Sequence, residues 1–172
     1  MQQSYFSLFN LEPRFALPLD RLEAAYRALA SQVHPDRYAH AGSAAQTHAM
    51  MLSTHANEAY RTLKKPVPRA RHLLNLRGVE VNERHNAVKP EFLMAQMEWR
   101  EALGDAKAAQ DINALQQLER FARNQTKALN ERLHAQLDTE QNNQAAIETM
   151  QQLMFVEKLA QEIDDAIVQL EG

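Results

Sequence analysis

Apolar residues recur along most of the chain at the three- and four-residue spacing of an amphipathic helix. In the first half, Leu22, Tyr26, Leu29 and Val33 follow one another at intervals of four, three and four. This spacing places them on one face of a helix. Stretches that alternate apolar and polar residues are short and β-branched residues are scarce, so strands are not expected. The pattern predicts an all-α protein.

Prolines and glycines divide the first half into short predicted helices, which we expect over 4–9, 19–33, 43–65 and 69–76. Asp20 and Glu23 have the spacing of a reciprocal capping pair at the start of the second helix. His34-Pro35 ends that helix, because proline disfavours helical geometry in the residue before it. Pro66-Val67-Pro68 interrupts the helical pattern again.

Three longer helical patterns follow Pro90, over 91–103, 111–138 and 143–170. Gly104 is expected to end the first of them. In the other two, apolar residues recur near heptad spacing. Short connections favour antiparallel neighbours, so the second half is predicted to form a three-helix bundle.

Charge divides the 172-residue chain at the same place. Residues 1–78 hold 10 Lys and Arg against 5 Asp and Glu, whereas residues 79–172 hold 9 against 17. All six prolines lie at or before Pro90. A basic first half and an acidic second half indicate different partners. We expect one domain over 1–75, a linker over 76–88 and a second domain over 89–172.

Composition and the distribution of apolar residues exclude several kinds of site and of protein. The absence of cysteine excludes a disulfide scaffold, a thiol nucleophile and a thiolate metal site. The N-terminal residues lack the basic start and apolar stretch of a signal peptide. Apolar runs fall far short of the roughly 20 residues that a membrane helix needs. We therefore expect a cytoplasmic protein that does not enter a membrane.

The tripeptide His34-Pro35-Asp36 lies between two predicted antiparallel helices. Pro35 restricts φ and stiffens the loop. Asp36 can accept a bidentate hydrogen bond from an arginine of a partner, and the His34 ring can donate, accept or stack. The alternative is a simple helix stop in which Asp36 caps the next segment.

The residues on either side of this loop favour the interpretation that it docks on a partner. Ser4-Tyr5-Phe6-Ser7-Leu8-Phe9-Asn10-Leu11 precedes the loop, and Ala56-Asn57-Glu58-Ala59-Tyr60-Arg61-Thr62-Leu63 follows it. Together these segments resemble the J-domain family. The resemblance implies that the loop docks on a DnaK-type chaperone and raises its rate of ATP hydrolysis. Arg27 and Arg37 are the basic residues placed to assist, although Ser31-Gln32-Val33 stands where many J-domains carry lysine or arginine.

The second half resembles the HscB family, the J-proteins of iron–sulfur cluster assembly. The resemblance rests on Phe92-Leu93-Met94-Ala95-Gln96-Met97-Glu98-Trp99-Arg100-Glu101 and Pro68-Arg69-Ala70-Arg71-His72-Leu73-Leu74. It implies an L-shaped molecule whose bundle binds an IscU-type scaffold and whose J-domain meets an HscA-type chaperone. The implied scaffold contacts are Leu93, Met94, Met97, Glu98, Glu101 and Phe155.

Packing is the competing explanation for several of these residues. Leucine and methionine at helical spacing usually belong to a core, and here Phe92 and Trp99 are expected to be the buried members. We also expect a first-half core that includes Tyr5, Phe6, Leu8, Leu29, Met50, Met51, Tyr60 and Leu63.

Other functions receive little support. His48 and His55 could share a helix face, and Glu131 and His134 have the spacing found in di-iron bundles, but a second such motif is missing. No glycine-rich phosphate loop or nucleophile motif is found. We expect no cofactor and no enzymatic activity. Two alternatives stay open, a bundle with a different client and a helical protein that binds nucleic acid through its basic half.

Overall fold

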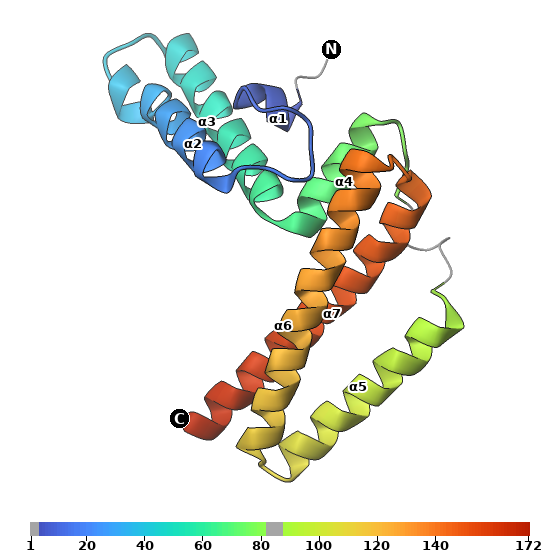
Figure 1. Cartoon of the computed structure of the whole chain (residues 1–172). Helices are drawn as coiled ribbons and strands as arrows, with labels where there is room; N and C mark the ends of the chain where they lie inside the picture. Colours follow the sequence, from blue (N-terminus) through green and yellow to red (C-terminus); the bar gives the residue numbers. More distant parts are fainter. Residues whose placement is uncertain (1–3, 82–87) are drawn as a thin grey trace. The chain divides into compact units, whose positions relative to one another are not determined.

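The computed structural model describes residues 4–81 and 88–172, and these residues form helices without any strand (Figure 1). The all-α prediction is confirmed. The chain divides into two compact units, Met1–Val79 and Glu80–Gly172. The first has the helical hairpin expected of a J-domain, and the second is a helical bundle.

The first unit is built around a helical hairpin. It contains α1 (Tyr5–Leu8), α2 (Leu19–Gln32), the 3₁₀ turn η1 (Pro35–Tyr38), α3 (Ser43–Lys64) and α4 (Pro66–Leu76). Figure 1 shows α2 and α3 side by side, joined by the segment that holds η1. Their facing sides bury Leu22 and Leu63, while α1 contributes Phe6 and α4 contributes Leu73 and Leu74.

The helix ends of this unit correct two predictions. Pro18, not Asp20, is the N-cap of α2, and no side chain caps it. Asp20 instead lies in the first turn, where a carboxylate interacts favourably with the helix dipole. The prolines after Lys65 do separate two helices, but α4 begins at Pro66 rather than at Arg69. Proline is well suited to a first helical position because its missing N–H needs no partner there.

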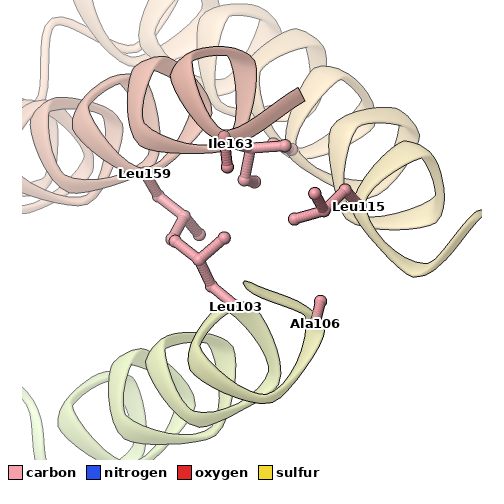
Figure 2. Packing of buried hydrophobic residues seen from close by; sticks show 7 residues of the cluster. Leu103, Ala106, Leu115, Leu159 and Ile163 are labelled. Atoms are coloured by element: carbon pink, nitrogen blue, oxygen red, sulfur yellow. The ribbon is translucent and has the colours of Figure 1, made fainter. Parts of the chain in front are cut away.

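The second unit contains α5 (Pro90–Ala108), α6 (Ile112–His134), the π-helical turn η2 (Ala135–Thr139) and α7 (Asn143–Glu171). Helices α6 and α7 lie side by side along most of their length (Figure 1). Leu103 and Ala106 pack the C-terminal end of α5 against Leu115 of α6 and against Leu159 and Ile163 of α7 (Figure 2). The helices predicted from spacing are present, and a turn of different geometry follows α6.

Gly104 does not end α5, contrary to prediction. The helix continues to Ala108, and Gly104 is an exposed interior position between the buried side chains of Leu103 and Ala106. Burial of these neighbours outweighs the roughly 1 kcal/mol by which glycine disfavours a helix relative to alanine.

The predicted core of the first unit is partly correct. Phe6 and Leu63 are fully buried, whereas Tyr5, Leu8, Leu29 and Tyr60 are half-buried. The prediction is wrong for Met50 and Met51, which are 61% and 68% exposed on α3. Their neighbour Ala49 faces the core instead.

Candidate docking surfaces

The loop after α2 is fixed by its own hydrogen bonds. His34 is the N-cap of η1, and its Nδ1 accepts a hydrogen bond from the backbone N–H of Asp36 at 3.3 Å. Pro35 occupies the first position of the turn, where its φ is already suitable. The histidine, rather than Asp36, therefore caps this turn, contrary to the alternative in which Asp36 is the cap.

Two further side chains tie the loop back to α2. The Arg37 guanidinium donates to the backbone carbonyl of Ser31 at 3.1 Å, and the Tyr38 hydroxyl donates to that of Gln32 at 3.2 Å. Carbonyls at the end of a helix lack intrahelical partners, so these bonds satisfy groups that otherwise depend on water. The loop is thus held rigidly against the end of the helix.

Asp36 extends from this rigid loop into solvent. Its side chain is 91% exposed, and its carboxylate lies 3.6 Å from His34 Nδ1. Arg27, two turns earlier on α2, is 76% exposed and pairs with Glu23 at 2.5 Å. An exposed ion pair of this kind contributes little to stability, so a stronger partner can replace it at small cost. The structure thus leaves an anion on the loop and a cation on α2 accessible.

The predicted scaffold contacts of α5 lie on its outer surface. Leu93, Met94 and Met97 are 46%, 64% and 72% exposed, so the alternative that they form core is wrong. Glu98 and Glu101 are exposed beside them on the same helix. We call these five residues the α5 strip. The strip combines apolar side chains and carboxylates on an exposed surface of the bundle.

Phe155 of α7 connects to α5 through aromatic packing. Its ring is half-buried and meets Phe92 edge-on, with ring centroids 5.9 Å apart. The Trp99 ring centroid lies 6.1 Å from that of Phe155 and 5.9 Å from that of Phe92, and Phe121 of α6 packs on Trp99 at 5.2 Å. Phe92 and Trp99 are only half-buried, so the prediction that they are the buried members of α5 is partly correct; the fully buried residues of this helix are Leu103 and Ala106.

Polar contacts that sequence reasoning missed hold α5 in place. Arg100 forms an ion pair with Glu162, and its guanidinium lies 5.4 Å from the centroid of the Phe155 ring. Lys89, just before α5, binds Glu148 at 2.8 Å. The hydrogen bond and the negative charge of Glu148 raise the pKa of Lys89. These partners are far apart in sequence and carry no local signal, so only the fold reveals them.

Among residues 4–81 and 88–172, no three histidine or acidic side chains come together in a way that could hold a metal ion. His134 Nε2 lies 3.6 Å from an Asp138 carboxylate oxygen. In the same part of the chain, every helix is too short or too polar to cross a bilayer.

Comparison with known proteins identifies the family. The co-chaperone protein HscB homolog of Burkholderia multivorans is 49% identical over 172 residues, which cover 99% of this chain and 98% of the relative. The chain belongs to the HscB family. The family model for the HscB C-terminal oligomerisation domain also matches residues 88–164.

Solved structures of HscB proteins share the fold. Chaperone HscB from Vibrio cholerae aligns with a TM-score of 0.89 at 34% identity and covers 98% of this chain and 99% of its own. Human co-chaperone protein HscB aligns with a TM-score of 0.88 at 25% identity, over 95% of this chain and 81% of its own. A J-domain followed by a helical bundle is therefore the HscB architecture, and this chain is a co-chaperone of that family.

Proposed function

We propose that this chain binds an IscU-type iron–sulfur scaffold, delivers it to an HscA-type ATPase chaperone of the DnaK class, and stimulates ATP hydrolysis by that chaperone. The work takes place in the cytoplasm and promotes maturation of iron–sulfur proteins. The cluster is cargo of the scaffold. The observation that carries the proposal is the Asp36 carboxylate, which a rigid loop holds exposed.

The J-domain, residues 1–75, supplies the activating surface. Asp36 accepts a bidentate hydrogen bond from an arginine of the chaperone, while Pro35 and the His34 cap keep the carboxylate in a fixed position. Because the loop is already ordered, little conformational entropy is lost when it docks. Arg27 and Arg37 favour approach to an acidic chaperone surface. The chaperone carries out the chemistry on ATP.

The bundle, residues 89–172, supplies the client surface. The α5 strip offers exposed leucine and methionine side chains that lose contact with water when the scaffold covers them. Methionine adapts its shape to a partner because its chain is unbranched and polarizable. Glu98 and Glu101 select basic residues at the edge of the contact, and Phe155 extends the apolar surface onto α7.

Coupling between the two surfaces follows from linkage. The loop and the delivered scaffold both favour the same state of the chaperone, so each strengthens the effect of the other. Scaffold and co-chaperone together should therefore stimulate hydrolysis more than their separate effects predict. Stimulation without this synergy would instead favour a bundle with a different client.

The first test replaces the exposed carboxylate. Asp36→Ala should reduce stimulation of the chaperone ATPase at least tenfold, because it removes the acceptor of a charge-assisted bond without disturbing a buried group. Scaffold binding, measured by calorimetry, should stay unchanged. Equal stimulation by variant and unaltered protein would contradict the role of the loop.

The second test addresses the client surface. Leu93→Ala/Met97→Ala should weaken scaffold binding at least tenfold, because we propose that these exposed side chains form the hot spot of the interface, where truncation of a residue costs about 2 kcal/mol or more. Stimulation without scaffold should remain normal. Met50→Ala/Met51→Ala is the matched control, because it removes exposed apolar side chains from α3. Equal losses in both variants would reject the α5 strip as the contact.

A further inference from the structure

A pocket in the first unit lies away from the loop that holds Asp36. It has a volume of about 720 Å³ and is lined by Tyr26, Asn57, Tyr60, Arg61, Thr62, Lys64, Lys65 and Pro68. These residues come mainly from the C-terminal turns of α3. Since α3 begins after the loop and its 22 residues extend about 33 Å, the pocket is at the other end of the hairpin.

Stacked tyrosines give the pocket a firm aromatic wall. The rings of Tyr26 and Tyr60 lie parallel, with centroids 4.2 Å apart and planes at 14°. The Tyr26 hydroxyl donates to Asn57 Oδ1 at 2.7 Å, which fixes the ring against α3. Pro68 closes another side from the first turn of α4. The hollow is therefore built by packing between three helices.

The charge of the pocket is positive and uncompensated. Arg61, Lys64 and Lys65 are exposed, and no carboxylate is among the lining residues. In the described part of the chain, none of the three forms an ion pair, and the Lys64 amine lies 5.4 Å from the centroid of the Tyr60 ring. Lysines near a helix C-terminus do stabilise the helix dipole. The interaction with the helix dipole does not explain why a hollow is present. It also does not explain the position of Lys65, which has an extended backbone and lies beyond the helix end.

We propose that this pocket binds an extended acidic peptide segment of a partner protein. Carboxylates of the segment would meet Arg61, Lys64 and Lys65, and an apolar or planar residue between them would lie against the tyrosine rings. Arginine binds carboxylates through two parallel hydrogen bonds, whereas lysines attract them as point charges. The proposal is independent of the loop and of the α5 strip.

Peptide fits this site better than nucleic acid does. A duplex or single strand presents phosphates at regular short intervals and is normally met by a continuous basic track. Here three cations surround one hollow, and the net charge of the chain is −3. A short segment with a few carboxylates matches both the number of cations and the concave shape.

Fluorescence anisotropy tests the proposal with a defined probe. The probe is a fluorescein-labelled ten-residue peptide of Glu and Asp with one central Trp, titrated with the full chain in 50 mM and 300 mM salt. We expect saturable binding that weakens at the higher salt. A peptide of the same length with lysine in place of the acids should not bind. Absence of saturable binding at 50 mM salt would overturn the proposal.

Charge reversal locates the binding. Lys64→Glu/Lys65→Glu should weaken the probe at least tenfold, while Arg120→Glu/Lys127→Glu, an equal change of charge at exposed positions of α6, should not. Circular dichroism checks that both variants fold. If both variants weaken the probe equally, binding depends only on the net charge of the protein, and the pocket is rejected as the binding site. Tighter binding of a 20-nucleotide oligothymidylate, lost in the same variant, would assign the pocket to nucleic acid instead.

Discussion

Four methionine side chains lie exposed on the surfaces of α3 and α5. Met50, Met51, Met94 and Met97 all occur at helical spacing near other apolar residues, and all four are exposed. Periodicity shows that residues share a face but not whether another helix covers that face. The residues of α5 were placed on the surface by family resemblance, whereas nothing in the local pattern did the same for Met50 and Met51.

His72 lies in a segment that carries the family resemblance, and its contacts give it a specific role in folding. Its Nε2 accepts a hydrogen bond from the backbone N–H of Tyr5 at 3.2 Å, and its ring stacks on that of Tyr5 with centroids 4.5 Å apart. Tyr5 and His72 line a second pocket of the first unit, to which α3 contributes His55 and Glu58. Only a neutral imidazole can accept this bond. Burial lowers the pKa of His72 below 6.5.

Stability of the first unit should therefore depend on pH. Because the unfolded chain keeps its His72 pKa near 6.5, it binds more protons than the folded chain does around that pH. The contribution of His72 is complete above pH 6.5 and is lost as the pH falls from there through the lowered folded-state pKa. His72→Gln keeps an acceptor without titration and should flatten this dependence.

Urea unfolding from pH 8 to pH 5, followed by circular dichroism, measures the effect, and NMR of the ring protons gives the pKa directly. The difference between unaltered protein and His72→Gln isolates this histidine from the other six. An identical pH profile for the two proteins would show that His72 has no such role.

Helix ends illustrate what the sequence determines at the scale of an element. The expected breaks at Pro35 and Pro66 occur, because proline cannot continue the preceding helix. Gly78 ends α4 with φ of +73°, and the N–H of Val79 bonds back to the carbonyl of Leu74. Gly104 looked similar in sequence but is helical, since packing of Leu103 and Ala106 holds α5 together around it. Tertiary contacts of this kind leave no local pattern.

These two glycines should respond oppositely to alanine. Gly104→Ala should raise the free energy of unfolding by about 0.5–1 kcal/mol, because the position is helical and an added Cβ meets no atom within 4 Å. Gly78→Ala should lower it by about 1 kcal/mol, because alanine is strained at positive φ.

Trp99 is the one tryptophan of the chain and lies in the second unit, so its fluorescence reports urea unfolding of the unit that holds Gly104. Circular dichroism follows the Gly78 variant. A loss of stability in Gly104→Ala would mean that α5 needs glycine for a reason other than helix propensity.

At the scale of the whole molecule, the two compact units differ in charge and in proline content. The basic part ends with the first compact unit, and the acidic part coincides with the second. The aromatic packing of Phe92, Trp99 and Phe155 and the ion pair of Arg100 with Glu162 were not predictable, because they join helices that are distant in sequence. A difference in composition between two parts of a chain can be read from the sequence, whereas the pairing of helix faces cannot.

Synergy with scaffold should require both docking surfaces on one chain. A mixture of Asp36→Ala with Leu93→Ala/Met97→Ala supplies an intact loop and an intact α5 strip on separate molecules. A covalent connection gives two sites an effective concentration in the millimolar range, which separate proteins at micromolar concentration do not reach. The mixture should therefore lack the extra stimulation of the chaperone ATPase that the proposed function predicts in the presence of scaffold.

Steady-state ATPase assays with each variant alone and with the unaltered protein at the same total concentration are the controls. Full synergy from the mixture would show that the two surfaces act without being joined.

The exposed methionines of α5 also make this surface sensitive to its redox environment. Met94 and Met97 are open to oxidants, whereas Met150 in the bundle is fully buried. Oxidation to the sulfoxide turns an apolar side chain into a polar one and is reversed by methionine sulfoxide reductases. Under peroxide stress the strip would lose its apolar character first, while the core and the loop with Asp36 stayed intact. If the proposed function holds, delivery of the scaffold would then stop without unfolding of this chain, and would resume once the sulfoxides were reduced.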